Sequence, residues 1–204
     1  LVSSRKKAFV VKPEDIAEQL LSVKDGNSKF FKSNIEFLVP YIDLAKCEPL
    51  ECLSSSGAHG EVFKSVYKED NCPIAIKLFR KKANQLNEAI VKSISNEVNT
   101  IATLVHDHIV EFKGMCNYHG TLGIVMELCD CSLYQYMEKH EGIDLHQKIN
   151  FLIQIADALC MCHKRGYLHG DLKLQNVLLK EERHFLDEVL VLKLCDFGMM
   201  KGIV

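Results

Sequence analysis

The chain has 204 residues, of which 48% are hydrophobic and 25% are charged, and its formal net charge is −2. This composition is that of an ordinary globular domain, and the small net charge gives no electrostatic reason to expect nucleic acid or an anionic membrane as a partner. No apolar run approaches the roughly twenty residues needed to span a bilayer, so the sequence predicts no membrane span. The first residues also lack a signal-peptide pattern.

Cysteine usage indicates the redox compartment. The nine cysteines are odd in number and lie scattered through apolar segments. This pattern favours reduced thiols over a disulfide framework, and it predicts a cytoplasmic location.

Residues 1–38 form an N-terminal extension that carries no chemistry of its own. Pro13 to Lys24 predicts a short amphipathic helix, with proline and acids in its first turn and Asp25-Gly26 as its end. Lys29 to Lys32 is basic and aromatic. We expect the extension to pack on the domain that follows, and a regulatory or partner-binding arm is the alternative.

Residues 39–80 alternate and turn as strands should, and a turn is expected at residues 68–71. The strand Pro73 to Phe79 is apolar with Lys77 inside it, and helical spacing follows from about residue 84 to residue 105. Glu97 falls on the apolar stripe of that helix. A carboxylate in an apolar stripe is costly unless a cation meets it, so we predict an ion pair between Lys77 and Glu97. The alternative is that Glu97 lies at the stripe's edge in water.

Two further strands, Ile109 to Cys116 and Leu122 to Leu128, are predicted around a turn at residues 117–120, and a hinge follows at Cys129 to Ser132. Beyond the hinge the pattern is helical. A short helix is predicted from Ser132 to His140, and Asp144 with Gln147 resembles a capping box that opens a long helix to about Arg165.

The apolar residues of that long helix surround it widely, so the sequence predicts a buried helix. They are Ile149, Leu152, Ile153, Ile155, Ala156 and Leu159. Short strands are then expected at Val177 to Leu179 and Val191 to Leu194, and the charged segment between them is interpreted as an enlarged, solvent-facing hairpin.

The chemistry is concentrated in His169-Gly-Asp-Leu-Lys-Leu-Gln-Asn176 and, twenty positions later, Asp196-Phe-Gly198. This order and spacing suits phosphoryl transfer from Mg-ATP. Asp171 would orient a substrate hydroxyl and accept its proton, and Lys173 would hold the moving phosphate. Asn176 and Asp196 would bind Mg²⁺.

These motifs, with Ser55-Ser-Gly57-Ala-His-Gly60-Glu-Val62 and Ile74-Ala-Ile-Lys77 upstream, resemble the protein kinase family from about Val39 to the last residue. The resemblance implies an α+β, bilobal fold: an antiparallel β small lobe with one key helix at about residues 39–128, and the start of a mainly helical large lobe at about residues 129–204. Glycines at the first motif let the backbone close over phosphates.

The resemblance also assigns a nucleotide site. Met126 would lie behind the adenine, and the backbones of Glu127 and Cys129 would bond its edge. The ring would lie between side chains at Val62, Ala75 and Leu178. The phosphates would be bound by the following residues: Ser55, Gly57, Gly60 and Lys77, the last steadied by Glu97.

Two positions depart from the family pattern. Ser55 stands where the family has a third glycine, and Gly170 stands where most members have an arginine that meets a phosphorylated activation segment. Glycine cannot make that contact, so we expect an activity that does not depend on residue 170 binding a phosphorylated activation segment. A nucleotide-binding pseudokinase, or a truncated scaffold without transfer activity, is the competing hypothesis.

Lys173, two places after Asp171, favours serine or threonine substrates. Val39-Pro-Tyr, Ser56 to Phe63 and Ile109 to Cys116 look similar to the mixed-lineage and dual-leucine-zipper kinases, so the protein substrate is expected to be a downstream kinase of a stress cascade. The chain begins at Leu1 and stops six residues beyond Gly198. We therefore expect an incomplete kinase domain, cut before the activation segment.

Overall fold

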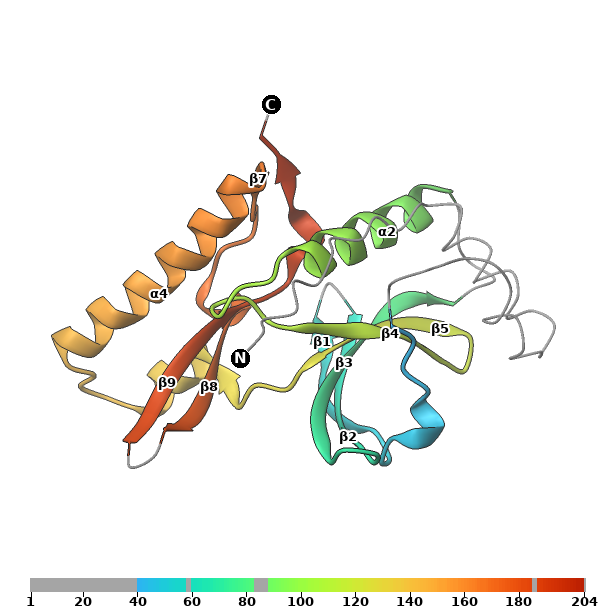
Figure 1. Ribbon diagram of the computed structural model, residues 1–204, viewed down its shortest axis with the longest axis horizontal. Coiled ribbons are helices and arrows are strands. Elements are labelled where there is room, and N and C mark those ends of the chain that lie inside the picture. Colours follow the sequence, from blue (N-terminus) through green and yellow to red (C-terminus); the bar gives the residue numbers. More distant parts are fainter. Residues whose placement is uncertain (1–39, 58–59, 83–87, 185–186, 204) are drawn as a thin grey trace, which may run out of the picture. The chain divides into compact units, whose positions relative to one another are not determined.

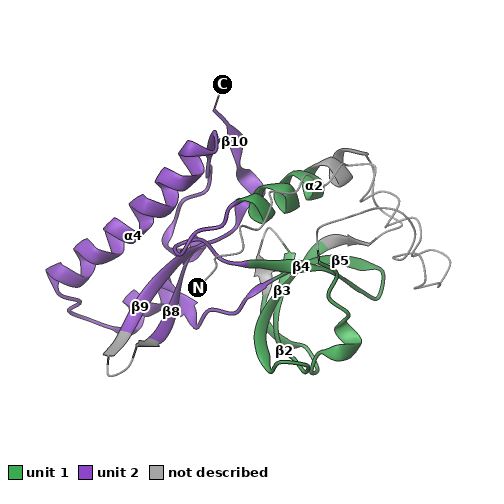
Figure 2. Cartoon of the chain, viewed as in Figure 1, with its two compact units in different colours: residues 1–103, 112–125 green, residues 104–111, 126–204 purple. Residues whose placement is uncertain are grey.

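The computed structural model describes residues 40–57, 60–82, 88–184 and 187–203 (Figure 1). For 55–57, 80–82, 88–92, 183–184 and 187–188 it describes the backbone alone. The predicted helix Pro13 to Lys24 and the stretch Lys29 to Lys32 lie outside the described residues. The chain divides into two compact units, unit 1 (Leu1–Thr103, Phe112–Val125) and unit 2 (Leu104–Glu111, Met126–Val204) (Figure 2). No helix in the described part of the chain combines the length and apolarity that crossing a membrane requires.

Unit 1 is built on a five-stranded sheet with the order β1-β2-β3-β5-β4, in which β1 pairs with β2, and β2 with β3, antiparallel. The predicted turn at residues 68–71 joins β2 to β3. His119 and Gly120 both have positive φ, as the two central residues of a type I′ hairpin turn require, and they join the next two strands. The elements are η3 (Leu44–Lys46), β1 (Glu51–Gly57), β2 (Gly60–Tyr67), β3 (Cys72–Lys82), α2 (Glu88–Thr103), β4 (Phe112–Tyr118) and β5 (Thr121–Glu127).

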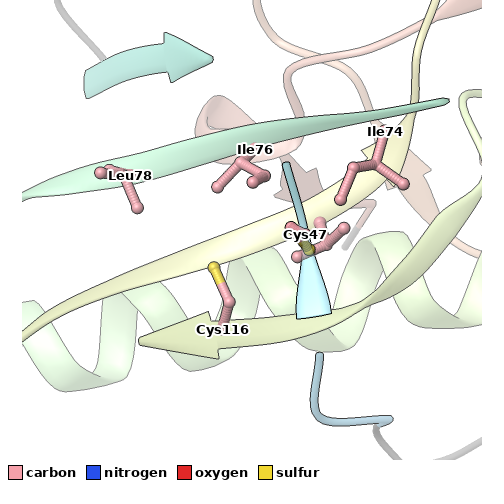
Figure 3. Close-up of a cluster of buried hydrophobic side chains, with 6 residues drawn as sticks. Cys47, Ile74, Ile76, Leu78 and Cys116 are labelled. Atoms are coloured by element: carbon pink, nitrogen blue, oxygen red, sulfur yellow. The ribbon is translucent and has the colours of Figure 1, made fainter. Parts of the chain in front are cut away.

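The core of unit 1 lies against one face of β3. Successive side chains of a strand point to opposite faces, so Ile74, Ile76 and Leu78 share a face, and they pack with Cys47 and Cys116 (Figure 3). Ala75 and Lys77 therefore lie on the opposite face. The hydrophobic core fixes β3 in the register that turns these two residues away from it.

Unit 2 contains a three-stranded sheet of order β6-β8-β9 and a two-stranded sheet of β7 and β10. The predicted short helix is confirmed as α3, with Ser132 and Gln135 forming a reciprocal capping box. The elements are β6 (Cys131–Ser132), α3 (Leu133–Lys139), α4 (Leu145–Lys164), β7 (Tyr167–Leu168), η5 (Leu174–Asn176), β8 (Val177–His184), β9 (Asp187–Leu194), η6 (Phe197–Met199) and β10 (Lys201–Gly202).

The long helix α4 begins as predicted, because the Asp144 side chain accepts from Gln147 N at 2.8 Å. The prediction that it is buried is wrong. Leu152 and Ile153 are 65% and 62% exposed, because β9 and β7 contact the stripe that holds Phe151, Gln154, Ala158 and Cys162. The apolar composition of α4 did not show which of its faces packs against other elements.

Two strand predictions also need correction. β4 begins at Phe112 rather than Ile109, because Ile109 pairs with the end of β9: Val110 N donates to Leu194 O at 3.0 Å. The charged segment after Leu179 extends both strands, since β8 runs on to His184 and β9 begins at Asp187 in one antiparallel ladder. The hairpin predicted there is confirmed, but its strands are longer.

Candidate active site

The predicted ion pair in unit 1 is present. Lys77 Nζ lies 2.6 Å from Glu97 Oε1, with side chains only 9% and 12% exposed. Lys77 comes from the middle of β3 and Glu97 from α2, so the pair joins the helix to the face of the sheet opposite the Ile76 core. Val62 lies opposite Lys77 in the β2–β3 ladder. Val62, Ala75 and Lys77, three of the predicted nucleotide contacts, therefore share one face of this sheet.

The predicted phosphate loop is the end of the β1–β2 hairpin, where Gly57 and Gly60 are opposite each other. Gly60 has φ +124°, and a Cβ there would come 2.1 Å from Leu78 O. Only glycine fits this close approach of two backbones. The tip, 58–59, lies outside the described residues, and so does the side chain of Ser55.

In unit 2 the residues of the predicted catalytic loop meet around Asp171. Lys173 Nζ lies 2.7 Å from Asp171 Oδ2. Asn176 Nδ2 donates to the same Oδ2 and to the backbone carbonyl of Asp171, both at 2.9 Å. Asn176 is buried, and it is held at the junction of η5 and β8 because its carbonyl accepts from Cys195 N at 3.0 Å. A short 3-10 turn thus sets the orientation of the Asp171 carboxylate.

His169 joins this loop to the segment before Asp196. Its Nε2 lies 2.9 Å from Cys195 O, and its Nδ1 accepts from Asp171 N at 3.3 Å. A carbonyl can only accept, so the ring carries its proton on Nε2. The His169 ring also meets the buried Phe197 edge-on, with centroids 5.3 Å apart. One buried histidine therefore contacts both halves of the predicted catalytic motif.

Asp196 occupies a left-handed backbone conformation, φ 62° and ψ 75°, at the start of η6. The pKa of Lys173 is raised, chiefly by its hydrogen bond to Asp171, and the charges of Asp171 and Asp196 help to outweigh desolvation. Both carboxylates therefore act on the same ammonium group.

Gly170 owes its identity to backbone geometry. It has φ +80°, and a Cβ would come 2.3 Å from Met199 O, immediately after the Asp196-Phe-Gly198 motif. From the sequence, the notable feature of position 170 is that glycine replaces the arginine of most kinases. The structure adds a steric reason for glycine, since a side chain would push the catalytic loop and η6 apart.

Asn176 and Asp196 have the donor chemistry that Mg²⁺ prefers, an amide carbonyl and a carboxylate. The two bonds from Asn176 Nδ2 to Asp171 direct the amide oxygen of Asn176 away from Asp171. This orientation fits a metal ligand, because the nitrogen is engaged with the protein and the oxygen would be the coordinating atom.

The predicted adenine-edge residues lie at the end of β5 and just beyond it, in unit 2. Met126 and Cys129 are half-buried and Glu127 is buried. Burial raises the pKa of the Cys129 thiol to about 12, with the Glu127 charge adding to the effect. Leu178 lies on β8, which pairs with β6 directly after this segment.

Sequence reasoning missed two lysines beside Glu127. Lys180 Nζ lies 2.8 Å from Glu127 Oε2, and Lys193 Nζ lies 3.2 Å from Glu127 Oε1. The available signal was Lys193 inside the apolar run Val191 to Cys195, the same kind of signal that identified Lys77. Glu127 had been predicted to act through its backbone alone.

The family model for the protein kinase domain matches residues 55–204, more than half of the chain. The chain belongs to the protein kinase family. The α+β fold class predicted from the sequence is thereby confirmed. Protein kinases as a family transfer the γ-phosphoryl group of ATP to a protein hydroxyl with the help of Mg²⁺.

The curated relatives of this kinase domain include serine/threonine kinases. "Probable serine/threonine-protein kinase kinX" of Dictyostelium discoideum is 31% identical over 176 residues, which cover 82% of this chain and 15% of that protein. Cyclin-dependent kinase F-4 of Oryza sativa subsp. japonica is 29% identical over 148 residues, 72% of this chain and 30% of that protein. Human cyclin-dependent kinase-like 5 is 30% identical over 148 residues, which cover 72% of this chain and 14% of that protein. The chain thus spans less than a third of the length of these relatives.

Proposed function

We propose that this kinase domain transfers the γ-phosphoryl group of Mg-ATP to a serine or threonine hydroxyl of a protein. The arrangement that carries the proposal is Asp171, oriented through its Oδ2 by Lys173 at 2.7 Å and by Asn176 at 2.9 Å. A carboxylate fixed in this way suits the orientation of a hydroxyl and the acceptance of its proton.

The other residues supply positioning and charge. Lys77, steadied by Glu97, aligns the ATP phosphates, and Lys173 neutralises charge on the moving phosphoryl group. Asn176 and Asp196 would hold Mg²⁺, which neutralises phosphate oxygens when bound. As the hydroxyl oxygen bonds to the γ-phosphorus, the bond to the β–γ bridging oxygen breaks, the hydroxyl proton passes to Asp171 and ADP leaves.

The proposal also includes the domain boundaries, the nucleotide contacts and the class of substrate. Residues 39–204 form the kinase part, and residues 1–38 precede it as an N-terminal extension. Residues Ser55, Gly57 and Gly60 cover the phosphates, the backbones of Glu127 and Cys129 bind the adenine edge, and Met126, Val62, Ala75 and Leu178 surround the ring. Similarity of short motifs to the mixed-lineage and dual-leucine-zipper kinases supports an enzyme of a stress-activated cascade, with a downstream kinase as substrate. The scattered cysteines support a cytoplasmic location.

The test is a radiolabelled phosphate-transfer assay on the full-length protein beside Asp171→Asn. We expect transfer to fall about 10²–10⁴-fold, the contribution typical of a positioned acid or base, while ATP binding persists. Retention of most activity would refute the role of Asp171. Stabilisation by Mg-ATP without transfer to any protein would select the competing pseudokinase, which Ser55 and Gly170 favour.

A further inference from the structure

Glu127 is a buried carboxylate whose side chain the proposed phosphoryl transfer does not use. It is 6% exposed. Its Oε1 accepts from Glu111 N at 2.8 Å and lies 3.2 Å from Lys193 Nζ in an ion pair, and its Oε2 accepts from Lys180 Nζ at 2.8 Å. Burial alone would raise the pKa of Glu127, but the hydrogen bonds from Lys180 and Glu111 N, with the charge of Lys193, lower it. A buried carboxylate is costly unless it is paired, and here two hydrogen bonds and an ion pair with a second lysine compensate for the lost water.

The two lysines come from one face of the β8–β9 hairpin. Lys193 is opposite Leu178 in the ladder, and Lys180 is opposite Val191. Residues two apart on a strand share a face, and so do directly opposed residues, so Leu178, Lys180 and Lys193 lie together. Leu178 is the residue proposed to lie against the adenine ring. The Glu127 cluster therefore adjoins the proposed ring contact within unit 2.

The chain just after Glu127 is tied to the same hairpin. Asp130 N donates to Leu179 O at 2.9 Å, and Asp130 Oδ2 accepts from Glu181 N at 2.8 Å. Residues 127–130, called the hinge segment below, are thus held at the start through the Glu127 side chain and at the end through Asp130. Cys129, whose backbone is proposed to bond the adenine edge, lies between the two attachments.

We propose that Lys180, Lys193 and Glu127 form a hinge clamp, a set of positioning residues that holds the backbone of the hinge segment in the shape that binds adenine. This inference rests on the proposed nucleotide-binding function and deepens it. The clamp acts on the base end of the nucleotide, whereas Lys77 acts on the phosphate end. That difference makes the effect of the clamp separable from the phosphate-binding role of Lys77.

The experiment measures dissociation constants of Mg-ATP and of adenosine, by calorimetry on the full-length protein, for wild type, Lys193→Met, Lys180→Met and Lys77→Met. We expect Lys193→Met to weaken both ligands by the same factor, about tenfold, or 1.4 kcal/mol. Lys77→Met should weaken Mg-ATP and leave adenosine unchanged. The control is Lys148→Met, which removes an exposed lysine of α4 and should change neither constant. Lys193→Arg, which keeps the charge, should restore most of the affinity.

Amide hydrogen exchange without nucleotide tests the clamp directly. In Lys193→Met the amides of Glu111, Asp130 and Glu181 should exchange faster than in wild type. If Lys193→Met does not fold, Lys180→Met gives the same test, since Lys180 is partly exposed and tolerates the change better. Unchanged exchange, or a loss of affinity for Mg-ATP but not for adenosine, would overturn the clamp. A wild type that binds neither ligand would refute the nucleotide function, and exchange would still decide whether the lysines hold the hinge segment.

Discussion

Glu97 in unit 1 and Glu127 in unit 2 are both largely withdrawn from water, but they are held by different sets of donors. Glu97 meets Lys77 at 2.6 Å, whereas Glu127 is shared by two lysines and a backbone amide. An ion pair between one strand and one helix can serve a ligand that also needs the lysine. A carboxylate that contacts two lysines of neighbouring strands and a backbone amide serves to hold the backbone. The difference in donors thus separates a group proposed to act on phosphate from a group proposed to position the hinge segment.

The largest expected effect concerns the unit 1 pair. Lys77→Met should lower phosphate transfer about 10²–10³-fold, the loss typical of one preorganised charge donor. The matched control is Lys46→Met, because Lys46 Nζ lies at the same 2.6 Å from Glu69 Oε1 but the side chains are 50% and 58% exposed. That substitution should leave transfer unchanged. Equal losses in the two variants would show that the assay responds to stability rather than to the nucleotide site.

Gly170→Arg tests whether the unit 2 network depends on backbone fit. The substitution restores the residue that most kinases have. If Gly170 reflected only the loss of a regulatory contact, the variant would keep its activity. The 2.3 Å approach of a Cβ to Met199 O and the φ of +80° predict the opposite. Displacement of the catalytic loop by about 1 Å should cost about 10²-fold in transfer. Gly170→Ala should already show most of the loss, and an active Gly170→Arg enzyme would contradict the steric explanation.

Glu127→Gln should lower the free energy of unfolding by about 3 kcal/mol, because it leaves two lysines facing a neutral amide in a buried place. Glu69→Gln makes the same change in the exposed pair with Lys46, and it should cost much less, because water screens that pair. Denaturant unfolding of each variant gives the measurement. Similar losses at the two sites would remove the energetic distinction between the buried cluster and an ordinary surface pair.

Sequence reasoning predicted the unit 1 pair because both residues break a clear pattern: Lys77 interrupts an apolar strand, and Glu97 falls on an apolar helix stripe. Most strands and helices could be predicted for the same reason, because their apolar residues recur with a clear period. The role of the Glu127 side chain was missed, because its partners lie 53 and 66 positions along the chain and only strand register brings them together. The exposed face of α4 was missed because periodicity does not say which of several apolar faces meets a neighbour.

The smallest effect is the pH dependence of the Glu127 cluster. Its hydrogen bonds hold the pKa of Glu127 below the ordinary value of 4.5 against the effect of burial. A carboxylate with a lowered folded-state pKa stabilises the protein above its unfolded pKa, and that stabilisation is lost as pH falls through the folded value. The difference in unfolding free energy between wild type and Glu127→Gln should therefore be constant between pH 7 and pH 6 and shrink below about pH 4.5. A difference that grew on acidification would mean that folding raises the pKa of Glu127 rather than lowering it, and the lysines would then not stabilise its charged form.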